Sequence, residues 1–111
     1  MSNNVFLRDQ VMRVMQGHRG RAAAMPRKVL LEELRLFRPK FTDRDCRELY
    51  SGLPLCSCED GLFLPETVAE VQEFKAYITK AWGPIQAHRR YSTIISFYPQ
   101  LAPPAEQLGL F

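Results

Sequence analysis

Residues 41–74 read FTDRDCRELYSGLPLCSCEDGLFLPETVAEVQEF, and the order of the structural elements can be predicted outward from them. Thr42 is a favourable N-cap, and Asp43 and Asp45 suit the positive end of a helix dipole. The residues behind this cap recur at the spacing i, i+3, i+4, i+7, which gives a helix one apolar face. That face comprises Cys46, Leu49, Tyr50 and Leu53. We therefore predict a helix that begins at Thr42 and is closed by Pro54.

A β-hairpin is predicted next. Two short β-capable runs, 55–58 and 62–64, flank an Asp-Gly turn within residues 59–61, which is a strong local hairpin signal. A long helical pattern follows the hairpin. Its buried stripe is expected to comprise Val71, Phe74, Ile78, Trp82 and Ile85. Gly83-Pro84 breaks or kinks this helix, and residues 85–98 look helical again.

Two further helices are predicted upstream. Residues 5–16 have an amphipathic pattern, residues 21–25 form a short connector or a small strand, and Pro26 is well placed to start a second helix. The second helix is stopped by Pro39, and its apolar face comprises Val29, Leu30, Leu34 and Phe37. The order is helix, connector, helix, turn, helix, hairpin, long helix. We therefore predict a mainly α fold with a small β-hairpin wing, namely a winged helix-turn-helix followed by extra C-terminal helices.

Residues 52–74 also resemble a winged-helix family of phage and mobile-element type. In that family a Gly-x-Pro-apolar-x-Ser core precedes a wing that ends in a Gly-aromatic pair and an acidic helix start. The residues in the corresponding places are Gly52, Pro54, Leu55, Ser57, Gly61, Phe63 and Glu70. The resemblance covers residues 5–80 or so. It implies that the third helix enters the major groove of duplex DNA and that the wing touches the backbone or the minor groove.

The same resemblance implies which basic residues contact DNA. Arg44 and Arg47 would face DNA from the third helix, whereas Lys28, Arg38 and Lys40 would meet phosphates near the turn. These residue types suit the task, because Arg pairs bidentately with guanine edges or phosphate and Lys acts as a point charge.

The charge pattern leaves two interpretations open. The net charge is +3, but residues 1–47 hold 11 of the 15 Lys and Arg and only 5 of the 12 Asp and Glu, which suits an anionic partner. However, Asp43, Asp45 and Glu48 alternate with the arginines of the third helix, so these charges can simply pair on the helix surface. The wing tip, Glu59-Asp60, is also acidic, and many winged helices bind proteins instead of DNA.

The sequence shows no catalytic or cofactor-binding constellation, so we predict a non-enzymatic protein with no cofactor and no metal. His18 and His88 have no convincing partner, and there is no phosphate-binding loop. Cys56 and Cys58 would lie on one face of a strand and could join Cys46 around zinc. Their spacing is not that of a structural zinc site, and small buried cysteines are the commoner outcome.

The chain shows no signal peptide and no apolar run of the roughly 20 residues that span a bilayer. We therefore expect a cytoplasmic protein, associated with the nucleoid or replisome, that has no membrane partner. Residues 66–98 carry more apolar surface than a small winged helix needs, so they can pack on the first helix or form a homodimer. Trp82 and Tyr91 are assigned to that core or dimer seam, and Arg89-Arg90 to a solvated turn of helix.

The last five residues, 107–111, read QLGLF. They resemble the motif that docks replication and repair proteins on the bacterial sliding clamp, the β subunit, commonly Gln-Leu-(Ser or Asp)-Leu-Phe. The glycine departs from this pattern at its tolerant middle position. The resemblance implies that Gln107 hydrogen-bonds at the pocket rim, that Leu108 fills a smaller hollow, and that Leu110 and Phe111 enter the main hydrophobic pocket. The alternative is that the tail packs on its own domain.

The sequence therefore predicts three parts: a winged helix-turn-helix domain at 1–82, a helix for packing or dimerisation at 83–98, and a flexible tether with a clamp-binding tail at 99–111. The predicted protein binds duplex DNA and the sliding clamp, and acts in DNA replication or repair or modulates them as a phage or mobile-element protein. Two alternatives remain open, a dimeric transcription regulator and a protein-only adaptor, each with a tail that packs on its own domain.

Overall fold

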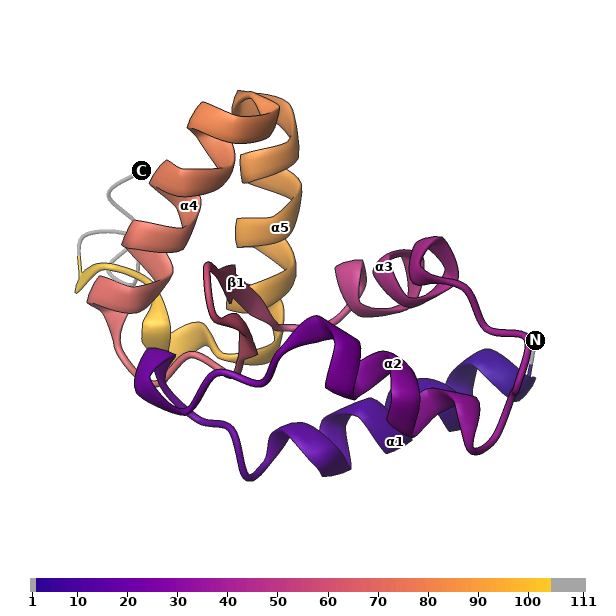
Figure 1. Cartoon of the computed structure of the whole chain (residues 1–111). Helices are drawn as coiled ribbons and strands as arrows, with labels where there is room; N and C mark the ends of the chain where they lie inside the picture. Colours follow the sequence, from indigo (N-terminus) through magenta and orange to yellow (C-terminus); the bar gives the residue numbers. More distant parts are fainter. Residues whose placement is uncertain (1, 105–111) are drawn as a thin grey trace.

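The computed structural model describes the backbone of residues 2–104 and the side chains of residues 5–104. Figure 1 shows a mainly α-helical protein with one small antiparallel hairpin, which confirms the predicted fold class. The elements are α1 (Ser2–Met15), the 3-10 turn η1 (Arg21–Ala23), α2 (Arg27–Arg35), α3 (Asp43–Ser51), β1 (Cys56–Cys58), β2 (Gly61–Phe63), α4 (Val68–Trp82), α5 (Pro84–Phe97) and the 3-10 turn η2 (Pro99–Leu101). None of the helices in this described part is long and apolar enough to cross a membrane.

The first three helices form the helix-turn-helix part and share one core. This core is made of side chains from all three helices, from the loop before the wing and from β2; they include Leu7, Val11, Met15, Leu30, Leu34, Leu49, Tyr50, Leu55 and Leu62. The predicted cap of α3 is present as a capping box. The backbone N–H of Asp45 donates to Thr42 Oγ1 (3.1 Å), and the Thr42 N–H donates to Asp45 Oδ2 (3.0 Å). These two bonds satisfy backbone donors that the helix itself leaves unpaired.

The wing is short, and its second strand is paired on both edges. β1 and β2 pair with Cys56 opposite Phe63 and Cys58 opposite Gly61, so the loop between them is Glu59-Asp60. On its other edge, β2 exchanges two backbone hydrogen bonds with Met25, of 2.7 and 2.8 Å. The small strand predicted as one possibility for residues 21–25 is therefore reduced to the single residue Met25, and Arg21–Ala23 form η1.

Gly61 is required where the wing meets the start of α2. Its φ is +130°, and a Cβ built on it would lie 2.0 Å from the carbonyl oxygen of Met25 and 2.8 Å from the Cα of Pro26. No other residue fits so close an approach of two backbones. The Asp-Gly signal thus predicts the hairpin correctly, but its glycine lies in β2 beside Met25 and not in the loop.

Helices α4 and α5 form an antiparallel helical hairpin beside the helix-turn-helix part (Figure 1). The wing lies between this helical hairpin and the first three helices. A second core joins this helical hairpin to the inner faces of the strands; it comprises Cys56, Phe63, Val71, Phe74, Ile78, Ala87, Tyr91, Ile94 and Leu101. The predicted buried stripe of α4 is correct as far as Ile78. Trp82 and Ile85 are instead 66% and 71% exposed, because they lie at the Gly83 turn where the hairpin ends.

The Pro-rich segment after α5 also differs from the prediction. Pro99–Leu101 form the turn η2, and Leu101 and Ala102 are buried. The prediction of a flexible tether beginning at Pro99 is therefore wrong for residues 99–102, because Pro99–Leu101 form η2 and Leu101 packs into the second core.

Candidate nucleic-acid interface

The outer face of α3 presents two exposed arginines, each beside a carboxylate of the same helix. Arg44 Nε lies 3.2 Å from Glu48 Oε1, and Arg47 Nη2 lies 3.7 Å from Asp43 Oδ2. The surface pairing that was considered as an alternative is therefore present. Exposed pairs of this kind contribute only about 0.3–0.5 kcal/mol, so they compete weakly with an incoming phosphate.

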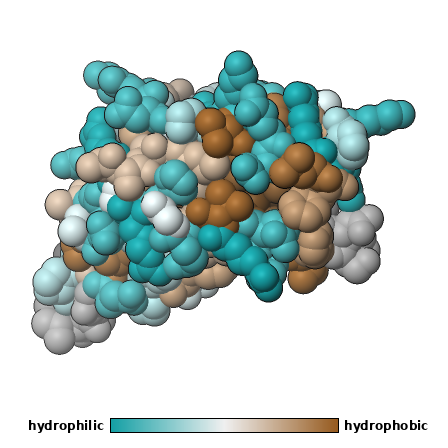
Figure 2. Space-filling view, turned by 60° about the horizontal axis from the view of Figure 1, so that its bottom comes forward, coloured by the Kyte–Doolittle hydropathy of each residue, from teal (hydrophilic) through white to brown (hydrophobic). Residues whose placement is uncertain are grey.

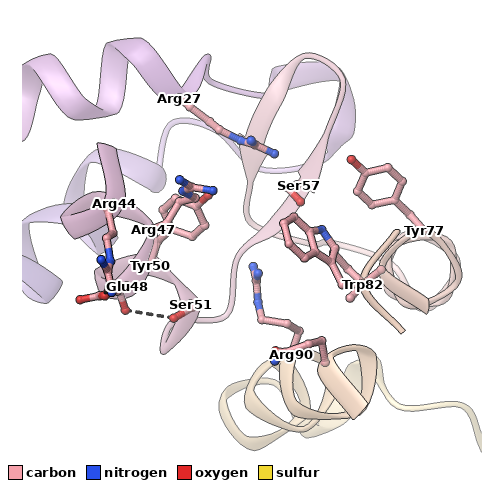
Figure 3. Close-up of a pocket in the computed structure, with 12 residues that line it drawn as sticks. Arg27, Arg44, Arg47, Glu48, Tyr50, Ser51, Ser57, Tyr77, Trp82 and Arg90 are labelled. Carbon is pink, nitrogen blue, oxygen red and sulfur yellow. Dashed lines mark hydrogen bonds and ion pairs between the residues drawn. The ribbon is translucent and has the colours of Figure 1, made fainter. Parts of the chain in front are cut away.

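These arginines line one side of an open groove of about 780 Å³ between α3 and the α4–α5 hairpin (Figure 3). Tyr77 and Trp82 of α4 form part of the opposite wall, and Arg90 reaches in from α5. Arg27, at the start of α2, enters from the side of the wing. The described lining contains four arginines and a single carboxylate, that of Glu48. The groove therefore has an excess of positive charge.

Arg90 lies deepest among these arginines. Its Nη2 donates to the carbonyl oxygen of Leu55 (3.1 Å), and its guanidinium lies 5.8 Å from the ring centroid of Tyr50 and 5.2 Å from that of Phe74. Its Nε is buried and has no hydrogen-bond partner. Burial lowers the pKa of Arg90 below its ordinary value, and the nearby Arg27 cation acts in the same direction. No ion pair found among residues 5–104 joins Arg90 to a carboxylate.

The structure divides the five predicted DNA-contacting residues into two groups. Arg44 and Arg47 line the groove. Lys28 is exposed on α2 beside the acidic loop of the wing. Arg38 and Lys40 lie in the turn between α2 and α3, where the Arg38 guanidinium is 5.9 Å from the ring centroid of Phe41. The turn residues and Lys28 do not line the groove.

The groove is also lined by residues that the sequence does not predict as DNA contacts, among them Arg27, Tyr77, Trp82 and Arg90. Arg90 was assigned to a solvated turn and Trp82 to a core or dimer seam. The structure instead packs Arg90 against two aromatic rings and leaves Trp82 exposed. One feature of the sequence indicates that α5 folds back beside α4. Gly83-Pro84 reverses the chain after Trp82, which folds α5 and its Arg90 back towards the wing.

Other exposed features carry less chemistry. Apolar side chains form separate spots among hydrophilic ones on the face shown in Figure 2. At the ends of α1 and α2, the rings of Phe6 and Phe37 are half-exposed and meet edge to face, with centroids 5.3 Å apart. Within the described residues, no three His, Cys, Asp or Glu side chains are grouped to hold a metal ion.

The predicted clamp-binding residues Gln107, Leu108, Leu110 and Phe111 lie outside the described residues. Comparison of the chain with protein-family models, with curated proteins and with solved structures finds no significant match.

Proposed function

We propose that this chain is a non-enzymatic DNA-binding protein that docks on the bacterial sliding clamp through its QLGLF segment. The observation that carries the DNA-binding part is the arginine-lined groove beside α3. The groove is lined by four arginines against one carboxylate, and two of these arginines, Arg44 and Arg47, lie on α3, the helix that a winged helix-turn-helix places in the major groove. Neutralising phosphates with such residues releases counterions, which gives salt-dependent affinity.

The clamp-docking part is supported by the sequence of residues 107–111, four of which match the motif. Burying a Leu or Phe side chain in an apolar pocket contributes about 1.5–3 kcal/mol. Two or three such anchors, less the cost of ordering the peptide, correspond to an affinity on the order of micromolar. Joined to a DNA-binding domain, a weak clamp site gains avidity, because both partners meet at replicating DNA. The protein would then act in DNA replication or repair, or modulate them for a phage or mobile element.

DNA binding is tested by fluorescence anisotropy of a labelled duplex with the full chain over a salt series. Replacing Arg44 and Arg47 together with Ala should lower the affinity and reduce the slope of log K against log salt by about 2. Arg13→Ala is the matched control, because Arg13 is exposed and also pairs at i,i+4, with Asp9, but lies on α1 away from the groove. If no duplex binding occurs at low salt, or if the control loses as much affinity, the proposed interface is wrong.

Clamp docking is tested separately, by pull-down of purified β clamp with the full chain. Changing Leu110 and Phe111 to Ala should abolish capture, whereas Gly109→Ser, which restores the commoner residue of the motif, should retain or strengthen it. Capture that is insensitive to the double change would exclude docking through this segment. A palindromic DNA site whose binding is unaffected by deleting residues 107–111 would favour the transcription regulator. Salt-dependent DNA binding that is unchanged without Arg44 and Arg47 would favour the adaptor.

A further inference from the structure

The wall of the groove opposite α3 is aromatic and exposed. Trp82 is 66% exposed and Tyr77 is 45% exposed, although both belong to a helix whose other large apolar side chains are buried. They project from α4 into the groove, across from the buried ring of Tyr50 on α3 (Figure 3). Aromatic side chains left open in a concave site offer large flat surfaces that a ligand can cover.

The charge of the same groove selects an anionic ligand. Arg27, Arg47 and Arg90 enter it from three different helices. Arg90 adds an independent observation, because no carboxylate pairs with its guanidinium in the described chain. A phosphate oxygen in the groove would supply the anion that this guanidinium lacks.

Exposed aromatic faces beside an excess of arginines match one ligand class. Single-stranded nucleic acid is held by basic side chains along its backbone and by aromatic rings on which its bases stack. Duplex DNA hides its base faces, so it gives the aromatic wall nothing to stack on. The volume of about 780 Å³ is that of pockets enclosing small molecules, about 300–1,000 Å³, which suits unstacked nucleotides better than a whole duplex.

We propose that this groove binds an unpaired segment of a DNA strand, so that the protein prefers a junction of duplex and single strand to a blunt duplex. This inference rests on the proposed DNA binding and names the form of DNA, but it is independent of clamp docking. The duplex part would contact α3 through Arg44 and Arg47, and the unpaired strand would pass between α3 and the aromatic wall.

The chain provides its own reporter, because Trp82 is the one tryptophan in the sequence. Intrinsic fluorescence of the full chain is followed during titration with an oligothymidine strand, a forked duplex with a single-stranded arm, and a blunt duplex. Stacking of a base on Trp82 should quench its emission with the first two probes and leave it unchanged with the third. Binding of the fork without any change in Trp82 emission would overturn the proposal.

Affinity is measured in parallel by anisotropy with the same three probes. Trp82→Ala and Tyr77→Ala should each weaken fork binding about 5- to 100-fold and leave blunt-duplex binding within about 2-fold. Ile85→Ala is the matched control, because Ile85 is 71% exposed near the same end of the helical hairpin but does not line the groove. All three side chains are exposed, so the variants should fold.

The outcomes separate this inference from the proposed function. If wild-type protein binds forked and blunt DNA equally, the inference fails and the proposed DNA binding stands. If it binds none of the three probes, both fail. If a labelled peptide of glutamate and aromatic residues binds in a Trp82-dependent manner and the fork does not, the groove is a protein-binding site and the inference is overturned.

Discussion

Replacing Gly61 with Ala tests the contact that joins the wing to the start of α2. The contact lies directly before α2, whose first residue, Arg27, lines the groove. The new methyl group would lie 2.0 Å from the carbonyl oxygen of Met25, and it would be attached to a backbone with φ of +130°. The clash is with backbone atoms, so it cannot be relieved by rotating a side chain.

The expected loss of stability has two parts. The backbone conformation costs a non-glycine residue about 1–3 kcal/mol. Moving the wing away from Met25 also breaks the two backbone hydrogen bonds between Met25 and Leu62, each with a net contribution of about 1 kcal/mol. The free energy of unfolding should therefore fall by about 3–5 kcal/mol, a large part of the 5–15 kcal/mol of an ordinary domain.

Two other glycines provide matched controls for urea unfolding followed by circular dichroism. Gly83 has φ of +94° and open space around it, so Gly83→Ala should lose only the conformational part, about 1–3 kcal/mol. Gly17 has neither a positive φ nor a close neighbour, so Gly17→Ala should be neutral or stabilising by up to about 1 kcal/mol. If Gly61→Ala and Gly83→Ala unfold at the same urea concentration, the close approach of the wing to Met25 is not what constrains position 61.

Three further predictions concern single side chains. The hydrogen bond from the backbone N–H of Thr42 holds the pKa of Asp45 below its ordinary value of 3.8. Asp45 therefore contributes stability that is present above pH 3.8 and is lost as the pH falls through the lowered pKa. The urea midpoints of wild type and Asp45→Asn should accordingly differ at neutral pH and converge at acidic pH. Cys46 and Cys56 are buried, and burial raises the pKa of Cys46 to about 11, whereas Cys58 is partly exposed. Cys58 should therefore react with an aromatic disulfide at pH 8 well before the two buried thiols. The absorbance of the released aromatic thiolate reports the reaction. Glu70 accepts backbone N–H bonds from Arg21 in η1 (2.7 Å) and from Glu66 in the loop before α4 (2.8 Å), so Glu70→Ala should lower the free energy of unfolding by about 1.5–3 kcal/mol. Glu73→Ala removes only an exposed 3.6 Å ion pair, so it should change the free energy of unfolding by less than about 1 kcal/mol in the same urea assay.

The parts of the fold that depend on neighbouring residues could be predicted from the sequence. The cap at Thr42 and the apolar face of α3 are local, since each involves residues within about two helical turns of one another. The hairpin follows from β-capable runs around a turn signal. The end of the buried stripe on α4 was not predictable, because periodicity identifies which face of a helix is apolar but not how far its neighbours extend beside it.

The groove could be predicted only in part, because its two walls are distant in sequence. Arg44 and Arg47 were recognised as candidates from their place on the third helix. Arg90 lies 35 residues from its partner Leu55, and its role depends on the reversal of the chain at Gly83. A pattern of residues along one helix cannot show which charges another helix brings opposite to it.

The burial of Leu101 sets the reach of the last residues of the chain. Leu101 packs in the second core and Ala102 is buried, and Gln107 follows Ala102 by five residues along the chain. A fully extended chain spans about 3.6 Å per residue, so the start of the QLGLF segment stays within about 18 Å of Ala102. If the segment docks as proposed, a clamp that encircles DNA would hold the folded part of this protein close to the surface of the clamp. The position of the clamp on the DNA would then determine which stretch of DNA the groove can contact, independently of the sequence of that DNA.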